Sequence, residues 1–521
     1  MSTADQHENA APGELDVRGP SSKRVTRWAL AALALYGAFL WLFRPASPFE
    51  WDEVLAQRAV LHYDVAAHAP QPPGFPAYIG AAKAVNWLVR DPLVALQVVG
   101  ILAALLALAA VWQLSRRLGA PPLVAGAAAA VVAATPSFAF MANVGSSDVT
   151  GTAMGVAAVL ALMAAVERPE LLPLAAVTAG LAVGVRPQIG AVFAPALMWA
   201  VTSAVRARRW GRLALAAGLG LLVAAACWVP AILVTGPQRW WWSTTNQIRF
   251  VATVERGNHL PGARLSDLLH HWFLSSFVGW QFAVPLWLLV VVGAVVLVRT
   301  GRGRLAGTAG MAAGAYIASA LLTMNMTTSL RYLLPATPFL AILAAGGLGA
   351  SWVTLRRAAG TLVVLWCLAA LAWAFPAFRE RLKPAPVWAA LTWVREHFDP
   401  AHTRIVYHGI ATPHVQYVLG KQGFRIIELG QGPTFEESER PGEQTLFVTP
   451  LPVPGADLLF EAHHTTRRVL ELAWGRYGSF AVSRLRTSAE AVFSPDWQLR
   501  RDGWQLAGTG FIHLPIGSKP A

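Results

Sequence analysis

Two adjacent carboxylates, Asp52 and Glu53, follow the first apolar run of the chain, and their type and position suit acid–base chemistry. They lie in Phe49-Glu50-Trp51-Asp52-Glu53-Val54, whereas most of the first 375 positions are hydrophobic. A charge near a bilayer is costly and tends to be kept for function. A carboxylate held there can take the proton from an attacking hydroxyl group. The alternative is that Asp52 caps the next helix, although the Glu that would complete a capping box is absent.

A double-proline turn, Gln71-Pro72-Pro73-Gly74-Phe75-Pro76, follows these carboxylates. Residues 52–60 have the pattern of a helix lying along the membrane surface, and the chain then passes His62, Asp64 and His68 before the prolines end it. His68 and Gln71 are therefore candidates for contact with a substrate. This first polar loop needs a framework that holds it at the bilayer surface.

Composition indicates a polytopic membrane protein with a polar end. The 521 residues are 55% hydrophobic and 13% charged, about half the charged fraction of a soluble domain. The net charge of +14 comes largely from Arg in short loops between apolar runs, as expected for topology and for anionic headgroups. The sequence has no basic aromatic module that would indicate nucleic-acid binding.

Apolar windows long enough to cross a bilayer number about eleven. They are residues 28–43, 92–114, 121–141, 149–166, 171–185, 188–205, 212–235, 277–298, 305–324, 333–353 and 359–375. Placing Lys23, Arg24 and Arg27 in the cytoplasm puts most other basic clusters there too, which fits the positive-inside rule. We therefore expect a cytoplasmic N-terminus and an external C-terminal part.

The chain divides by composition into three parts. Residues 1–27 are polar and are expected to form a disordered cytoplasmic tail, and residues 28–375 form the transmembrane domain. Residues 376–521 are more polar and contain short β-like runs such as 404–407 and 445–448 together with helix-like stretches. They predict an extracytoplasmic α/β domain that is long enough to have its own core.

The carboxylate pair and the double-proline turn resemble the dolichyl-phosphate-mannose protein mannosyltransferase and aminoarabinose transferase group. Gly184-Val185-Arg186-Pro187-Gln188 and Arg331-Tyr332-Leu333-Leu334-Pro335-Ala336 also look like segments of bacterial members. The resemblance extends over most of the membrane part and implies the multi-spanning GT-C fold and lipid-phosphate sugar donors. The C-terminal domain matches no family in this way.

The resemblance implies roles for three acidic residues and shows one departure. Asp52 would be the base that activates the acceptor, with Glu53 beside it in support, and Asp148 would be the second acidic residue of the cavity. The alternative for Asp148 is an N-cap of the span that follows. Aminoarabinose transferases have a Lys immediately before the two prolines that contacts the donor phosphate, but this chain has Gln71. Another cation must hold the phosphate, or the donor differs.

Arg331 is the best substitute for that Lys, and Arg186 is the second. A guanidinium group binds phosphate oxygens in a two-pronged way, and Tyr332 lies beside Arg331 in the chain. The alternative for both Arg residues is an interfacial side chain that reaches the lipid headgroups. Tyr332 and Arg249 are further candidates for substrate contact, and Arg249 lies in the long external loop after Trp240-Trp241-Trp242. These Trp residues suit an interfacial aromatic belt or stacking faces for a sugar.

Together these features predict a glycosyltransferase of the bacterial inner membrane. It would move mannose or a similar sugar from a polyprenyl-phosphate donor to a glycan, lipid or protein acceptor on the external face. No cofactor is required by this reading, although Asp52, Glu53 and Asp148 could bind a divalent metal. The alternative is a flippase of lipid-linked saccharides. Two features oppose it: the chain lacks internal repeats, and its candidate charges lie in external loops.

Overall fold

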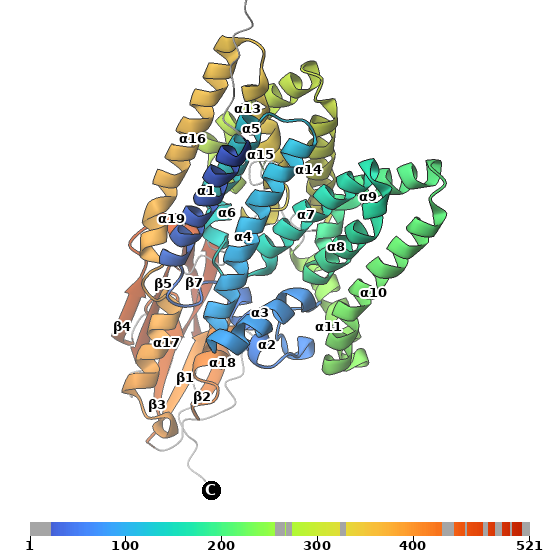
Figure 1. Cartoon of the computed structure of the whole chain (residues 1–521). Coiled ribbons are helices and arrows are strands. Elements are labelled where there is room, and N and C mark those ends of the chain that lie inside the picture. Colours follow the sequence, from blue (N-terminus) through green and yellow to red (C-terminus); the bar gives the residue numbers. More distant parts are fainter. Residues whose placement is uncertain are drawn as a thin grey trace, which may run out of the picture.

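The computed structural model describes residues 22–255, 266, 273–323, 330–429, 442–453, 456–472, 478–484, 492–500 and 503–512. Most of the predicted N-terminal tail therefore lies outside the described residues. Helices form the larger part of the molecule, and two sheets lie together at one end of it (Figure 1).

The helices follow the predicted apolar runs, with shorter helices between them. They are α1 Ser22–Leu42, α2 Trp51–Leu61, α3 Pro76–Val89, α4 Pro92–Arg117, α5 Pro122–Ala134, α6 Pro136–Met141, α7 Ser147–Glu167, α8 Leu172–Val185, α9 Gly190–Arg206, α10 Trp210–Thr235, α11 Pro237–Phe250, α13 Trp280–Arg299, α14 Gly303–Thr323, α15 Thr337–Ala345, α16 Val353–Glu380, α17 Pro386–His397, α18 Thr412–Val418 and α19 Arg467–Leu472. Proline occupies the first turn of many of them, where its missing N–H costs nothing.

Seven helices among the described residues are long and apolar enough to cross a membrane, and they include α4, α7, α10, α13, α14 and α16. Four shorter apolar helices, Arg27–Leu42, Pro122–Ala134, Pro169–Val185 and Thr337–Gly349, coincide with further predicted spans. The mostly helical membrane architecture with a C-terminal sheet region is thus confirmed. The count of about eleven spans stays a prediction, because these four are shorter than the roughly twenty residues of a full crossing.

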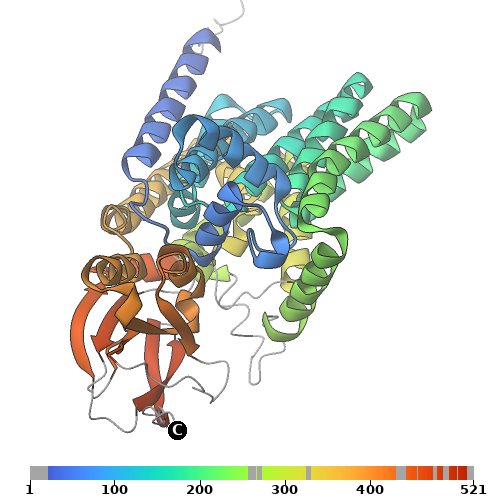
Figure 2. The same cartoon turned by 90° about the horizontal axis from the view of Figure 1, so that it is seen from below.

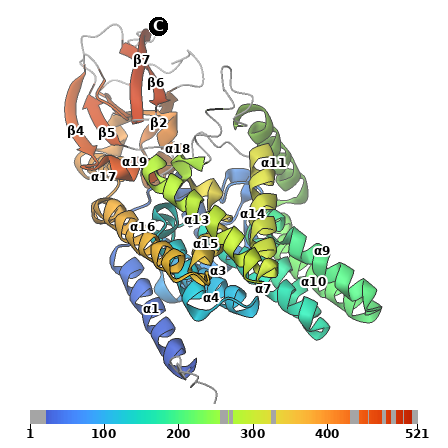
Figure 3. The same ribbon diagram turned by 90° about the horizontal axis from the view of Figure 1, so that it is seen from above.

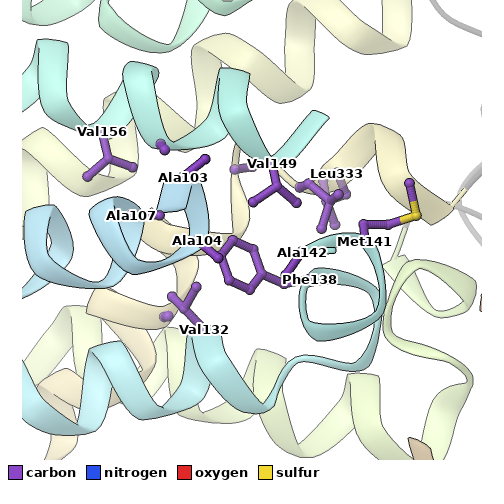
Figure 4. Close-up of a cluster of buried hydrophobic side chains, with 14 of the residues drawn as sticks. Ala103, Ala104, Ala107, Val132, Phe138, Met141, Ala142, Val149, Val156 and Leu333 are labelled. Atoms are coloured by element: carbon purple, nitrogen blue, oxygen red, sulfur yellow. The ribbon is translucent and has the colours of Figure 1, made fainter. Parts of the chain in front are cut away.

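The core of the helical part joins α4, α5, α6 and α7 to the short 3₁₀ turn Leu330–Leu333. Phe138 of α6 is fully buried beside Ala104 and Ala107 of α4, and Val149 of α7 and Leu333 lie in the same cluster (Figure 4). Because Val149 follows Asp148 and Leu333 lies two residues after Arg331, this packing fixes the segments that carry both charged side chains.

The C-terminal part contains a mixed five-stranded sheet in the order β2-β1-β3-β5-β4 and a two-stranded sheet, β6-β7. The strands are β1 Thr403–His408, β2 Arg425–Leu429, β3 Gln444–Thr449, β4 Asp457–His463, β5 Ser479–Arg484, β6 Val492–Arg500 and β7 Gly503–Ile512. β1 pairs in parallel with β2 and β3, and the other neighbours are antiparallel. Figures 2 and 3 show both sheets to one side of the helices, next to α17.

Gly293 of α13 makes a close helix contact that tolerates no side chain. A Cβ atom there would overlap the carbonyl oxygen of Leu343 in α15. Small residues at such crossings let membrane helices approach closely. We expect Gly293→Ala to lower the free energy of unfolding by about 1–3 kcal/mol or more, as overpacking does.

The measurement is thermal unfolding in detergent, with Gly310→Ala in α14 as the matched control. A Cβ atom at Gly310 meets nothing within 4 Å, so the control keeps or slightly raises the stability because Ala favours a helix over Gly. Equal unfolding temperatures for the two variants would refute the close contact.

Candidate active site

Arg331 lies buried between two carboxylates that come from distant parts of the chain. Its Nη2 atom is 2.6 Å from Oδ2 of Asp52 in α2, and its Nη1 atom is 3.7 Å from Oδ2 of Asp148 in α7. Arg331 is 6% exposed and Asp148 4% exposed. Burial opposes the charged form, but the negative charges of Asp52, Asp148 and Glu50 raise the pKa of Arg331 above its ordinary value. The guanidinium group therefore stays charged.

Arg186 joins the same network from the end of α8. Its Nη1 atom is 2.8 Å from Oδ1 of Asp148 and 3.1 Å from Oγ of Ser147. The guanidinium carbon also lies 5.7 Å from the centre of the Phe75 ring. Asp148 thus bridges the two cations, and the segment after the double prolines meets the network through Phe75.

The capping alternatives for the two acidic residues are wrong. Helix α2 begins at Trp51 with Glu50 as its N-cap, and α7 begins at Ser147 with Ser146 as its N-cap. Asp52 and Asp148 therefore lie inside the first helical turns, and their side chains pair with Arg331 and Arg186 instead of with backbone N–H groups. Carboxylates at helix N-termini are also stabilised by the helix dipole.

Glu53 holds two backbone segments together through hydrogen bonds to its carboxylate. Its carboxylate accepts hydrogen bonds from the N–H groups of Phe49 and Gly145, each at 2.8 Å, and the side chain is fully buried. Burial raises the pKa of Glu53 to about 7, while the N–H groups of Gly145, Phe49 and Glu50 and the charge of Arg381 act against that rise. Glu53 therefore fixes the loop before α2 against the loop before α7, and α7 carries Asp148.

We expect Glu53→Ala to destabilise the protein, because it leaves the buried N–H groups of Phe49 and Gly145 without acceptors. Each lost partner costs about 1–3 kcal/mol. Thermal unfolding measures the loss. Glu167→Ala is the control, because the partly exposed pairs of Glu167 with Arg117 and Arg304 are worth at most about 1 kcal/mol each. A larger loss in the control would contradict this role of Glu53.

Arg381, directly after α16, binds the backbone of two segments near the loop that leads to Asp52. Its Nε atom donates to the carbonyl oxygen of Phe43 at 2.9 Å, and Nη1 donates to that of Phe140 at 2.6 Å. The guanidinium group also lies over the rings of Phe140 and Phe378. This fully buried side chain joins the ends of α1, α6 and α16 beneath the loop that leads to Asp52.

The C-terminal part of the chain contacts the segment that leads to the carboxylates. His464 stacks on Phe49 with ring centres 5.4 Å apart, the N–H of Ala385 donates to Ser47 Oγ at 2.8 Å, and Arg58 of α2 donates to Gln416 at 3.2 Å. The N–H of Phe49 also donates a hydrogen bond to Glu53. The C-terminal part of the chain therefore supports the loop that positions Asp52.

The remaining predicted site residues lie around this network. Tyr332 packs beside Arg331, whose guanidinium carbon is 5.8 Å from the ring centre. His68 lies at the surface, where partial desolvation by its neighbours and the charge of Arg58 lower its pKa. Gln71 is half-buried and Arg249 is exposed on α11. No described contact connects His68, Gln71 or Arg249 with the ion pairs of Arg331.

The loop 62–75 is fastened by polar contacts with α11. Asp64 accepts from the N–H groups of Ala66 and Ala67 and forms an ion pair with Arg239 at 2.8 Å. The indole N–H of Trp240 donates to the carbonyl oxygen of Pro73 at 2.9 Å. Trp241 and Trp242 are exposed, which agrees with the predicted aromatic belt.

Sequence reasoning missed several residues of the site. Glu50 is fully buried near Arg331, Ser147 binds Arg186, and Phe75 packs on the same guanidinium group. Glu50 belongs to the motif that contains Asp52, and Phe75 belongs to the double-proline motif. Their positions next to predicted site residues in the sequence could have identified them. Within the described part of the chain, no group of three or more His, Cys, Asp and Glu side chains could hold a metal ion.

Comparison with known proteins relates the chain to a group of glycosyltransferases. Residues 71–233 match the family described as dolichyl-phosphate-mannose-protein mannosyltransferase, and the match begins at Gln71 of the double-proline turn. The resemblance found in the sequence is therefore confirmed over this range. No curated protein sequence matches the chain significantly.

Solved structures of ArnT have a similar fold. ArnT from Cupriavidus metallidurans bound to undecaprenyl phosphate aligns with a TM-score of 0.57 at 13% identity, covering 90% of this chain and 99% of that chain. The apo state of ArnT from the same organism gives a TM-score of 0.53 at 13% identity, covering 89% and 98%. At this identity the likeness is one of fold, and it confirms the fold class that the resemblance implied.

Proposed function

We propose that the protein is a glycosyltransferase that moves a sugar, mannose or a similar one, from a polyprenyl-phosphate carrier to an acceptor hydroxyl group. The observation that carries the proposal is the buried Arg331 between Asp52 and Asp148, with Arg186 on the other side of Asp148. Cations suit a departing phosphate and a carboxylate suits an attacking hydroxyl. The shared fold with ArnT bound to undecaprenyl phosphate supports a carrier of this class.

Transfer at this network needs one bond made and one bond broken. The acceptor hydroxyl gives its proton to the Asp52 carboxylate while its oxygen forms a bond with the anomeric carbon of the sugar. The bond between that carbon and the phosphate oxygen breaks, and the lipid phosphate leaves with the bonding electrons. Arg331 and Arg186 stabilise the charge that develops on this phosphate. The direct displacement inverts the configuration of the anomeric carbon.

The ion pairs also set a condition for this chemistry. In the structure the Asp52 carboxylate accepts a hydrogen bond from Arg331, so this oxygen is not open to an acceptor hydroxyl group. A phosphate that binds Arg331 competes with Asp52 for the guanidinium group. Binding of the donor therefore frees the carboxylate for the acceptor, and Asp148 keeps Arg186 and Arg331 in place meanwhile.

We assign the other predicted residues to supporting parts of the site. Glu53 positions the loop of Asp52, and Tyr332 orients Arg331. His68, Gln71 and Arg249 would contact the donor or the acceptor at the edge of the site. The acceptor would be a glycan, a lipid or a protein, and the lipid tail would lie among the membrane helices.

The proposal extends to organisation and location. Residues 28–375 would form the transmembrane glycosyltransferase domain and residues 376–521 an extracytoplasmic domain, with residues 1–27 as a cytoplasmic tail. The protein would lie in a bacterial inner membrane and act on its external face. Its partners are then the lipid-linked donor, the acceptor and membrane lipids.

The test uses purified protein in sealed vesicles with undecaprenyl-phosphate sugars labelled on the sugar, mannose first, together with membrane extract. We expect the label to appear on a new acceptor as undecaprenyl phosphate is released. Movement of intact labelled donor across the vesicle membrane, with no release of undecaprenyl phosphate, would overturn the proposal in favour of a flippase.

A further inference from the structure

Tyr78 of α3 has a buried hydroxyl group that the proposed mechanism does not use. The residue is 1% exposed, and its hydroxyl oxygen has no hydrogen-bond partner among the described residues. A buried polar group without a partner costs free energy and calls for an explanation. A Phe at this position would keep the packing without that cost, so the hydroxyl group itself points to a missing partner.

The ring of Tyr78 is held firmly by apolar neighbours. It packs in a cluster with Ala56 and Ala59 of α2, Leu96 of α4 and Val185 of α8. Val185 directly precedes Arg186, and Leu96 lies near Gly145, whose N–H group binds Glu53. The ring is therefore fixed between the helices that carry the ion pairs, and its hydroxyl group has little freedom to find another partner.

The hydroxyl group lies in a negative part of the site. Burial raises the pKa of Tyr78, and the charges of Glu53, Asp148 and Asp52 raise it further. The group is therefore a neutral O–H that can both donate and accept a hydrogen bond. The cations of the network are the groups that suit a phosphate, so the ligand that suits this hydroxyl group is a neutral one with hydroxyl groups.

Helix α3 also places Tyr78 on the donor side of the network. Phe75 is the N-cap residue of α3, three residues before Tyr78 in the chain. The Phe75 ring packs on Arg186, which is one of the two proposed phosphate-binding cations. The group next to a phosphate held there is the sugar that the phosphate carries.

A second hydroxyl group shows the same lack of a partner. Ser146 is 3% exposed, and its Oγ atom has no hydrogen-bond partner among the residues that the structure describes. It lies two residues before Asp148 and next to Ser147, which binds Arg186. An unpartnered buried hydroxyl group thus also lies in a segment that carries one of the ion pairs.

We propose that Tyr78 is a sugar-binding residue whose hydroxyl group donates a hydrogen bond to an oxygen of the transferred sugar, beside the lipid phosphate. This inference rests on the proposed glycosyltransferase function and adds the contact that distinguishes a sugar-bearing lipid phosphate from the bare lipid phosphate. Sites that hydrogen-bond a substrate hydroxyl discriminate strongly against ligands that lack it.

The test compares wild type with Tyr78→Phe in lipid nanodiscs. Binding is measured for undecaprenyl phosphate alone and for a panel of undecaprenyl-phosphate hexoses and pentoses. We expect Tyr78→Phe to bind undecaprenyl phosphate as wild type does but to lose about three- to tenfold in affinity for the preferred sugar-bearing lipid, the worth of one hydrogen bond. Its unfolding temperature should equal or exceed that of wild type, because a buried unpartnered hydroxyl group is removed.

The matched control is Tyr36→Phe, because the Tyr36 hydroxyl group donates to the carbonyl oxygen of Ala133 at 3.2 Å. It should lower the unfolding temperature and leave every affinity unchanged. The inference is overturned if Tyr78→Phe binds the preferred sugar-bearing lipid as tightly as wild type does. It is also overturned if wild type binds undecaprenyl phosphate but has no higher affinity for any of the sugar-bearing lipids. If wild type binds no lipid phosphate at all, the proposed function fails, and the inference fails with it.

Discussion

Asp52→Asn should reduce the rate of sugar transfer by about 10²- to 10⁴-fold, the usual contribution of a general base. The amide cannot accept the acceptor proton, yet it matches the carboxylate in shape and can still accept a hydrogen bond from Arg331. Asp52 is also the least buried of the four ionised side chains in this network, at 24% side-chain exposure against 11% for Arg186, 6% for Arg331 and 5% for Asp148. We therefore expect the fold to survive. The measurement is the single-turnover rate with labelled donor.

The control for this variant is Asp64→Asn, in the loop that follows α2. Asp64 pairs with the exposed Arg239 and caps a 3₁₀ turn, so its loss should cost stability but little transfer. Affinity for undecaprenyl phosphate should remain or increase in Asp52→Asn, because the competing carboxylate is gone. An Asp52→Asn protein that is folded and transfers sugar at the wild-type rate would eliminate Asp52 as the base.

Arg331→Ala has the second large expected effect, on both stability and binding. It leaves Asp52 and Asp148 close together without the cation that neutralises them, and breaking a buried pair in this way costs about 3–5 kcal/mol. Affinity for undecaprenyl phosphate should fall by at least about tenfold, since hydrogen bonds to charged groups are worth about 1.5–3 kcal/mol. Thermal unfolding and lipid-phosphate binding measure the two effects.

Two further variants separate charge from shape at Arg331. Arg331→Lys keeps the charge but loses the planar guanidinium group, whose two Nη atoms face Asp52 and Asp148. We therefore expect intermediate losses of stability and of affinity for undecaprenyl phosphate. Arg239→Ala is the control, because the Arg239 side chain, which pairs with Asp64, is 61% exposed. Such a pair is worth about 0–1 kcal/mol. If Arg331→Ala is as stable as Arg239→Ala and binds undecaprenyl phosphate normally, Arg331 is not the phosphate site.

The membrane architecture and the main charged residues of the site were predictable from the sequence. Apolar windows located the helices because crossing a bilayer requires a long apolar run. Asp52, Asp148, Arg186 and Arg331 could be chosen because charges near such runs are costly and rare. Their direct pairing depends on tertiary packing: Val149 and Leu333 belong to one core cluster (Figure 4), which no local pattern specifies.

The parts that could not be predicted depend on side-chain direction. Glu53 follows Asp52 in the chain, but adjacent residues of a helix point to different faces. One therefore binds Arg331 while the other binds the backbone of Phe49 and Gly145. The contact between His464 in the C-terminal part of the chain and Phe49 joins residues more than 400 positions apart, so spacing along the sequence could not predict it.

The most direct test of the proposed site is an experimental structure with undecaprenyl phosphate bound. We expect the phosphate to accept hydrogen bonds from Arg331 and Arg186 at about 2.7–2.9 Å, with Asp52 no longer bonded to Arg331 and open to the acceptor. A phosphate bound elsewhere, with the Asp52–Arg331 pair intact, would contradict the assignment of this network as the transfer site.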